Sequence, residues 1–372
     1  MDDALAMREA LALAARGRGN VEPNPRVGAL ALRDGEIVGR GFHRAWGEPH
    51  AEVEALRDAA KAGARPDTVV VTLEPCAAEP GEGGKKTGSC TRALLEAGVR
   101  RVVYGASDAD PRHRGRGPGL LRAAGVEVVG GVEAEACAAL NRPFARWLTL
   151  ARPWTIAKWA MSLDGKIATR TGASRWISGE AARRSVHELR ARVDAVAVGF
   201  RTVLRDDPLL TVRDVPGPSP LRVVIDPEAA LPLGTRLVQT AREVPVLALV
   251  GAQAPEERCV ALATAGVEVL RVGASGEVAG SRAFDVAAAW RLLRGRGVRR
   301  LLVEGGGRLA ASLFAADIVD QVLAFVAPVV LGGEDAPTPV MGEGVGELAQ
   351  AWRFPESVVH EVGGDAAISA IR

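Results

Sequence analysis

Apolar positions along the first part of the chain alternate between helical and strand spacing. Residues 4–16 carry apolar side chains at the spacing of an amphipathic helix, and an apolar run follows at 27–32. Asp34-Gly35 stands between this run and a second strand expected at 36–41, as in a tight hairpin. Further helices are expected at 49–63, 90–97 and 119–124, and further strands at 68–73 and 101–104. This alternation is typical of an α/β domain.

The pattern resets around residues 142–153, where a helix and a connector precede a new strand at 155–161. The second half then alternates again, with helices expected at 180–191, 285–295 and 307–315, and strands at 194–199, 221–225, 245–250, 300–303 and 320–327. A chain of 372 residues is long enough for two domains. We therefore expect two α/β domains, over residues 1–146 and 147–372.

Composition narrows the classes of function. Hydrophobic residues make up 48% and charged residues 25%, as in ordinary globular proteins. A net charge of +2 and only 4% aromatic residues disfavour a nucleic-acid partner. The N-terminus opens with two acids before its helix, unlike a secretory signal, and no apolar run approaches the roughly 20 residues that span a membrane. We expect a cytoplasmic protein without membrane partners, whose four cysteines stay reduced.

Three potential metal ligands stand at the starts or ends of predicted elements. His50-Ala51-Glu52 opens a helix, Pro75-Cys76 follows a strand, and Cys90 opens another helix. One imidazole and two thiolates form a hydrolytic zinc site that keeps one position for water, and His-x-Glu with Pro-Cys is a known signature of zinc deaminases. Zinc lowers the pKa of bound water towards ~7. Glu52 is then the expected proton carrier.

The alternative for each of these residues alone is structural. A histidine at a helix start usually caps it, and a lone cysteine is usually an inert core residue. We expect that structural role for Cys137 and Cys259, which lack such neighbours. Residues 77–89 separate Cys76 from Cys90, whereas the signature has two intervening residues. Because the cost of loop closure grows slowly with length, the longer loop still permits chelation.

The first half resembles the bifunctional riboflavin-biosynthesis deaminase–reductase family. The matching segments are Pro23–Gly28, Asp34–Gly39, Gly47–Glu52, Thr72–Cys76 and Ala93–Val99. The resemblance implies a cytidine-deaminase-like, three-layer α/β/α fold, with Asn24 and His43 contacting the substrate. The family's shorter cysteine loop contains a Ser-His pair that this chain lacks, although Lys86 and Thr87 match its end.

The segment Asp108–Gly117 also resembles a family segment, except at Ala109 and Asp110. It contains three arginines that either meet a substrate phosphate or lie on a solvated loop, namely Arg112, Arg114 and Arg116.

Three segments of the second half carry weaker signals when each is taken alone. Lys158–Lys166 is a strand that runs into an Asp-Gly turn. Asp206-Asp207 is either a functional carboxylate pair or a helix cap. Glu304–Gly307 is either a phosphate-binding turn at a helix start or a plain turn, and it lacks the spacing of the dinucleotide fingerprint.

Together with Ser174–Ser178, Thr202–Pro208, Leu210–Arg213 and Val329–Gly333, these segments resemble the reductase half of the same family. The resemblance implies a dihydrofolate-reductase-like α/β fold and NADPH as the cofactor. The implied cofactor contacts are Ala160, Trp176, Thr202, Asp206, Gly306 and Gly307. The implied substrate contacts are Ser174, Arg190, Leu210, Arg213 and Glu304, of which Arg213 suits a phosphate. Lys158 and Asp206 are the candidates for polarising and protonating the sugar.

The resemblance implies two successive reactions on a small molecule. The first is the zinc-dependent deamination of 2,5-diamino-6-(5-phosphoribosylamino)pyrimidin-4-one, and the second is the NADPH-dependent reduction of its ribosyl group to ribityl. It also implies a homo-oligomer, either a dimer or a tetramer. Three alternatives remain: a reductase whose altered cysteine loop has disabled the deaminase, a nucleoside or transfer-RNA deaminase, and a zinc-dependent binding protein.

Overall fold

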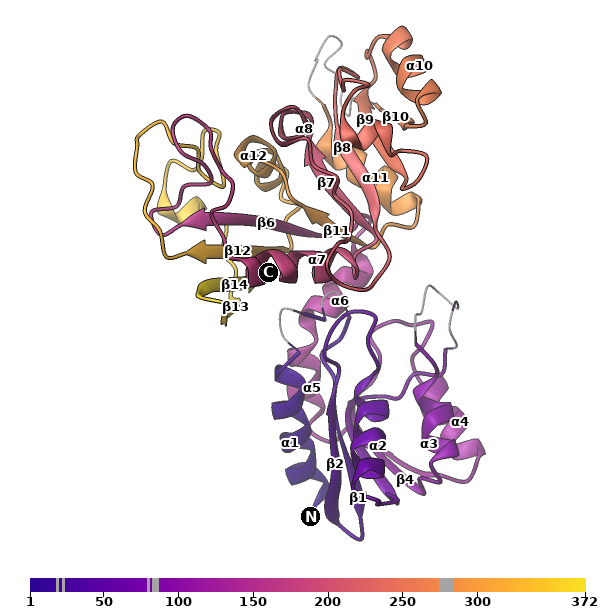
Figure 1. Cartoon of the computed structure of the whole chain (residues 1–372). Coiled ribbons are helices and arrows are strands. Elements are labelled where there is room, and N and C mark those ends of the chain that lie inside the picture. The colour runs from indigo at the N-terminus through magenta and orange to yellow at the C-terminus, as the bar shows by residue number, and fades with distance from the viewer. Residues whose placement is uncertain (18–19, 22–23, 79–80, 82–86, 274–283) are drawn as a thin grey trace. The chain divides into compact units, whose positions relative to one another are not determined.

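The chain forms two compact units, Met1–Leu150 and Ala151–Arg372, each built on its own sheet (Figure 1). The computed structural model describes residues 1–17, 20–21, 24–78, 81, 87–273 and 284–372. Within these residues, no helix has both the length and the apolar character needed to cross a membrane.

The first unit contains a five-stranded sheet in the order β2-β1-β3-β4-β5. Its strands are β1 (Gly28–Arg33), β2 (Glu36–Phe42), β3 (Thr68–Leu73), β4 (Arg101–Ala106) and β5 (Glu127–Gly130). β1 pairs antiparallel with both β2 and β3, while β4 and β5 extend the sheet in parallel. Asp34 and Gly35 both have positive φ, which is the backbone of the tight turn expected from this dipeptide.

Helices cover both faces of this sheet. α1 (Asp3–Ala15) and α5 (Ala134–Leu140) pack on one face, while α2 (Ala51–Lys61), α3 (Cys90–Glu96) and α4 (Arg116–Ala123) lie on the other (Figure 1). α6 (Arg142–Thr149) follows as the last helix of the unit. Glycines permit close approach, because a Cβ on Gly28 would lie 2.0 Å from a backbone oxygen of α1 and one on Gly41 would lie 2.2 Å from a backbone oxygen of α2. The three-layer α/β/α arrangement expected from the sequence is confirmed.

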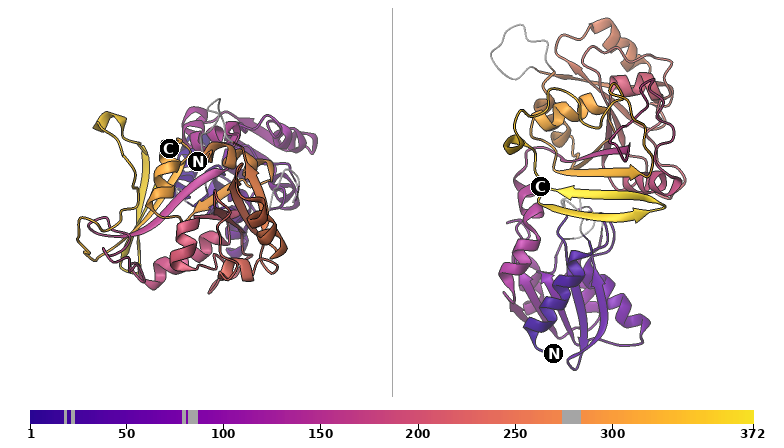
Figure 2. Two further views of the ribbon diagram at one scale, coloured as in Figure 1. Left: turned by 90° about the horizontal axis from the view of Figure 1, so that it is seen from above. Right: turned by 90° about the vertical axis from the view of Figure 1, so that its left-hand side faces the viewer.

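The second unit contains a nine-stranded sheet in the order β10-β9-β8-β7-β11-β6-β12-β14-β13. The strands are β6 (Trp154–Ser162), β7 (Ala195–Gly199), β8 (Leu221–Ile225), β9 (Val246–Gly251), β10 (Glu268–Val272), β11 (Arg300–Val303), β12 (Gln321–Ala327), β13 (Glu356–Val362) and β14 (Asp365–Ile371). The strands from β10 to β12 are parallel, and β14 and β13 add an antiparallel hairpin beside β12 (yellow in Figure 2).

The alternation of side chains along β6 separates the two faces of this sheet. Trp159 and Met161 pack into the larger core with the helices α11 (Val286–Gly295) and α12 (Gly307–Ala315). Ala160 points the other way and packs with α7 (Glu180–Arg190). Lys158 has the same parity as Ala160, so it emerges on the α7 face. The remaining helices are α8 (Phe200–Asp206), α9 (Arg236–Gln239) and α10 (Glu256–Thr264).

The sequence pattern missed the shorter and more polar elements. β5 has only four residues, and β13 is an edge strand with mostly partly exposed or exposed side chains, so neither shows a clear apolar period. The other elements that the sequence analysis did not predict are α5, α8, α9, α10, β10, β14 and the short 3-10 helix η2 (Leu348–Gln350).

The close approach of α1 to the sheet can be tested at Gly28. We expect Gly28→Ala to lower the stability of the first unit by about 1–3 kcal/mol, because the added methyl group must push the backbone of α1 away. Gly119→Ala, on α4 with open space around its Cβ position, is the matched control and should leave stability unchanged or slightly higher. Urea unfolding of both variants measures the difference, and equal midpoints would contradict the packing argument.

Candidate active sites

Three separate segments bring an imidazole and two thiols together in the first unit. His50 is the N-cap residue of α2, Cys76 follows the carboxyl end of β3, and Cys90 is the first residue of α3. Their ligand atoms all lie within 4.8 Å of one another. His50 Nδ1 lies 3.2 Å from Cys90 Sγ and 3.5 Å from Cys76 Sγ. A tetrahedral zinc ion would separate such nitrogen and sulfur atoms by about 3.5 Å, so the arrangement fits this metal.

Hydrogen bonds around the ligands hold their orientation. His50 Nε2 lies 3.1 Å from the Thr87 hydroxyl, which suits an Nε2–H donor and leaves Nδ1 free of its proton for a metal. The Cys76 carbonyl accepts hydrogen bonds from the Ser89 and Thr91 hydroxyls, and the Cys90 amide donates to Cys76 Sγ. Of the loop between the cysteines, residues 79–80 and 82–86 lie outside the described residues, and so does the family match at Lys86 and Pro23.

The other residues expected in this site surround His50. Glu52 is buried on the first turn of α2, and burial raises the pKa of its carboxyl, although a divalent cation at the neighbouring ligands would act in the opposite direction. The His43 ring packs edge-on to the His50 ring at 5.3 Å. Its Nδ1 donates to the Pro49 carbonyl, and the Asn24 amide lies 3.3 Å from its Nε2. Burial lowers the pKa of His43 to about 4, so its ring is neutral at neutral pH.

Two arginines of the segment after β4 make hydrogen bonds within their own loop. Arg112 binds the buried Asp110 carboxylate through two nitrogens, and this hydrogen bonding lowers the pKa of Asp110 to about 2. Arg114 donates to the Asp108 carbonyl. The negative charge of Asp110 is therefore balanced by a local cation, and the local contacts of Arg112 and Arg114 favour the structural alternative for these two arginines.

A cleft of about 1050 Å³ opens in the second unit at the carboxyl ends of β6, β7, β8 and β11. All the residues that the sequence placed in the reductase site line this single cleft. They are Lys158, Ala160, Ser174, Trp176, Arg190, Thr202, Asp206, Leu210, Arg213, Glu304, Gly306 and Gly307. Gly306 is the N-cap residue of α12, so the helix start faces a cavity that a phosphate could enter.

A buried ionic network forms one wall of the cleft. The Arg190 guanidinium donates to both carboxylate oxygens of Glu304, from Nε to Oε1 at 2.6 Å and from Nη2 to Oε2 at 3.0 Å. Lys158 Nζ lies 3.8 Å from Oε2 of the same carboxylate. The two cations lower the pKa of Glu304 against the opposing effect of its burial. Burial lowers the pKa of Lys158, while Glu304 acts to raise it. One carboxylate thus neutralises part of the charge of two cations.

Arg213 differs from these cations, because no ion pair joins it to a carboxylate among the described residues. Its guanidinium donates to the Thr211 hydroxyl, and burial together with the nearby charge of Arg190 lowers its pKa. An exposed guanidinium that lines the cleft without a counterion among the described residues is suited to bind an anionic ligand.

The adjacent Asp206 and Asp207 make different contacts. Asp207 accepts from the Arg236 amide at the start of α9, which is the capping alternative considered from the sequence. The Asp206 carbonyl accepts a hydrogen bond from Arg175, and its side chain makes no hydrogen bond or ion pair with Lys158 in the described part of the chain.

Sequence reasoning missed several cations of the cleft. Arg201, Arg205, Arg236 and Arg308 also line it. Arg183, from α7, stacks on the exposed Trp176 ring at 4.7 Å and donates to the Ser178 carbonyl. The helical spacing of Arg183 from Arg190, two turns apart on one helix, was the available signal.

The two sites define a two-domain enzyme in which a zinc-binding deaminase domain is joined to a reductase domain. Residues 1–106 match the zinc-binding region of cytidine and deoxycytidylate deaminases, and residues 153–360 match the RibD C-terminal domain. The chain belongs to the RibD family of riboflavin biosynthesis proteins.

Similar proteins support this membership along the whole chain. The riboflavin biosynthesis protein RibD of Actinobacillus pleuropneumoniae is 37% identical over all of this chain and 96% of that protein. The protein of the same name from Escherichia coli (strain K12) is 35% identical over the whole of both. A solved structure of Acinetobacter baumannii RibD is 32% identical, with a TM-score of 0.67 over 99% of this chain and 98% of that one.

A Thermotoga maritima structure is 32% identical, with a TM-score of 0.64 and the same coverage. It is described as a diaminohydroxyphosphoribosylaminopyrimidine deaminase/5-amino-6-(5-phosphoribosylamino)uracil reductase. These matches confirm the cytidine-deaminase-like and dihydrofolate-reductase-like folds expected from the sequence, with zinc and NADPH as the cofactors.

The ligand set predicts how zinc content responds to substitution. We expect the purified chain to hold one zinc ion, and Cys76→Ser or Cys90→Ser to lose most of it, because each removes one of three protein ligands. Cys137→Ala, a buried thiol of the same unit outside the ligand group, should keep its zinc. Elemental analysis of the dialysed proteins measures this, and full zinc in both serine variants would overturn the ligand assignment.

Proposed function

We propose that the first unit deaminates 2,5-diamino-6-(5-phosphoribosylamino)pyrimidin-4-one, and that the second unit then reduces the ribosyl group of the product to ribityl with NADPH. The observation that carries the proposal is the convergence of His50, Cys76 and Cys90 beside the buried Glu52. The name of the Thermotoga maritima relative supplies the pair of reactions. The functional domains would be residues 1–146 and 147–372.

In the deamination, the protein's residues hold the reactants and move protons. When bound, zinc supplies an activated water molecule at neutral pH. Glu52 takes a proton from this water and delivers it to the departing amine, which leaves as ammonia. Its buried position keeps the transfer away from solvent. Asn24 and His43 contact the substrate beside His50, and the neutral His43 ring offers a hydrogen bond without adding charge.

In the reduction, NADPH supplies the hydride when bound. We assign its contacts to Ala160, Trp176, Thr202, Asp206, Gly306 and Gly307, which share the cleft with the start of α12. The substrate contacts are Ser174, Arg190, Leu210, Arg213 and Glu304. Lys158, held beside Glu304, polarises the sugar, and Asp206 is the candidate proton donor. Arg213 receives the substrate phosphate.

We further propose that the enzyme works in the cytoplasm as a homo-oligomer, a dimer or a tetramer, without nucleic-acid or membrane partners. The four cysteines form no disulfide among the described residues, which suits a reducing compartment. The net charge of +2 offers no field that would attract nucleic acid.

Glu52→Gln separates the two activities. The amide keeps the shape of the side chain but cannot carry the proton, so ammonia release should fall by about 10²–10⁴-fold while bound zinc is retained. NADPH oxidation with the already deaminated substrate should stay at the wild-type rate, which shows that the second unit is intact, while the retained zinc shows that the first unit is folded. An unchanged rate of ammonia release would refute the role of Glu52. A wild-type chain that binds zinc and consumes NADPH but releases no ammonia would favour the alternative of a disabled deaminase.

Arg213→Ala tests the phosphate contact in the reductase. Loss of a charge-assisted hydrogen bond is worth about 1.5–3 kcal/mol, so the KM for the phosphorylated substrate should rise about 10–100-fold with little change in kcat. Arg291→Ala, on the exposed face of α11 outside the cleft, is the matched control. Initial rates of NADPH oxidation give both constants, and a wild-type KM for Arg213→Ala would rule out this contact.

A further inference from the structure

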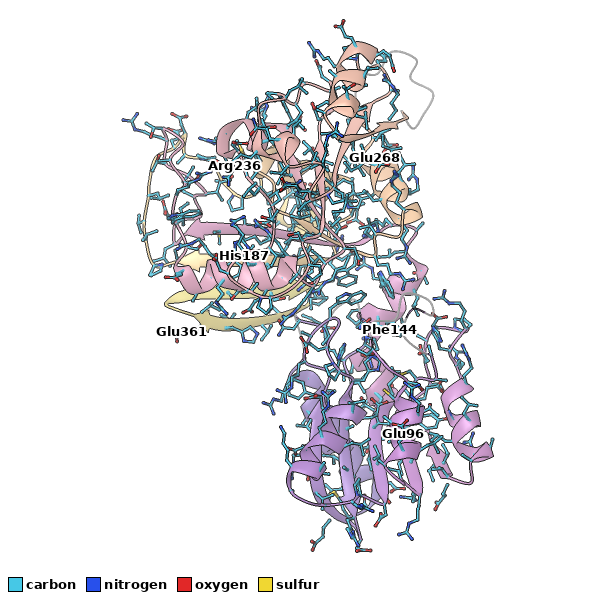
Figure 3. All side chains as sticks on the ribbon, turned by 45° about the vertical axis from the view of Figure 1, so that its right-hand side comes forward. Glu96, Phe144, His187, Arg236, Glu268 and Glu361 are labelled. Carbon is cyan, nitrogen blue, oxygen red and sulfur yellow. The ribbon has the colours of Figure 1, made fainter. Side chains whose placement is uncertain are left out.

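His187 lies on α7 (Figure 3), one turn before Arg190, and only 8% of it is exposed. Its Nδ1 atom accepts a hydrogen bond from the backbone amide of Arg213, at 3.1 Å. An imidazole can accept at Nδ1 only when that nitrogen carries no proton, so the geometry requires the neutral ring. His187 is not one of the described residues that line the cleft, so any effect on a ligand must pass through Arg213.

The hydrogen bond belongs to a set that fixes the main chain of residues 209–213. Arg222 donates to the Leu209 carbonyl, Arg190 donates to the Thr211 carbonyl, and the Val212 amide donates to the Ser219 hydroxyl. Leu210, between these anchors, is held at a φ of 55°, an uncommon conformation for a leucine. The anchor at the last residue of this segment is the imidazole of His187, and its hydrogen bond is the one that is lost when the acceptor is protonated on acidification.

The charged groups around the ring come from three elements. Arg190 lies on the same helix, Arg213 and Asp214 lie on the loop, and Glu304 follows β11. Burial and the two arginines lower the pKa of His187, and the two carboxylates act to raise it with smaller effect. The neutral ring is therefore the dominant form at neutral pH, and its protonation needs a lower pH than that of an exposed histidine.

We propose that His187 is a positioning residue of the reductase: its unprotonated Nδ1 holds the Arg213 backbone so that the guanidinium meets the substrate phosphate, and protonation of the ring releases this anchor and weakens substrate binding. The inference rests on the proposed phosphate contact of Arg213. It adds a residue that touches neither substrate nor cofactor, together with a dependence of KM on pH.

Protonation has two opposing consequences for an anionic ligand. It places an N–H against the Arg213 amide, so that two donors face each other and the loop must move. It also adds a positive charge, which attracts a phosphate. The first effect dominates at this site, because the ring is buried against the backbone and the cleft already contains the guanidinium groups of Arg190 and Arg213.

Two variants of His187 and one control separate the anchor from a merely structural role. His187→Asn keeps an acceptor at the position of Nδ1 but cannot titrate in the working range, whereas His187→Leu removes the acceptor. Ser185→Ala, on the same helix and outside the cleft, is the control. The KM and kcat for NADPH oxidation are measured from about pH 4.5 to 8.5, a range that extends well below the usual histidine pKa of about 6.5. A kcat near the wild-type value reports that the second unit of each variant is folded, because the same unit carries the reductase site.

We expect His187→Leu to raise the KM for the phosphorylated substrate about fivefold at pH 8, the factor that corresponds to one hydrogen bond of ordinary strength, with kcat nearly unchanged. The wild-type KM should rise by a similar factor as the pH falls. His187→Asn should keep the wild-type KM at pH 8 and show a smaller rise on acidification, because only the substrate phosphate still titrates in it.

Other outcomes overturn the inference. Identical pH profiles for the wild type and His187→Asn, or a wild-type KM in His187→Leu, would show that the anchor does not position Arg213. A fall of the wild-type KM with acidification that His187→Asn lacks would show that the added charge outweighs the lost anchor. If Arg213→Ala also leaves KM unchanged, the phosphate contact itself fails; if Arg213→Ala raises KM and His187→Leu does not, only the present inference fails.

Discussion

The first unit depends on the meeting of one imidazole and two thiols from three distant segments. Each ligand sits where a regular element begins or ends: two at helix starts and one just beyond the carboxyl end of β3. The sheet and its helices must therefore pack closely before the site exists, which is why glycines stand where α1 and α2 approach the strands. Metal binding in turn adds its free energy to the folded state only, since the unfolded chain has no preformed site.

In the second unit, several cationic side chains line one cleft. Glu304 compensates Lys158 and Arg190, so these two groups are ordered without a ligand. Arg213 has no such counterion among the described residues and is held through its main chain instead. An anionic ligand then meets a preorganised guanidinium, which reduces the conformational entropy lost on binding. The network around His187 is part of this preorganisation.

Both sites follow one structural rule. The ligand residues of the first unit gather at the carboxyl end of β3, and the cleft of the second unit opens at the carboxyl ends of four parallel strands. In α/β proteins the loops at this edge come from several strands at once, so residues far apart in sequence meet there. The same backbone geometry thus serves hydrolysis in one unit and hydride transfer in the other.

Local sequence patterns were sufficient for the long helices, the apolar strands and the ligand types His50, Cys76 and Cys90, because periodicity and residue chemistry are local properties. They could not reveal β13, which is defined by pairing with β14 at a sheet edge, nor the division of labour between Asp206 and Asp207. Arg213 and His187 are 26 residues apart, and only the tertiary structure brings one backbone amide onto one ring nitrogen. The sequence determined which chemical groups are available, while packing decided which of them face a partner, because distance and burial arise only when separate elements are brought together.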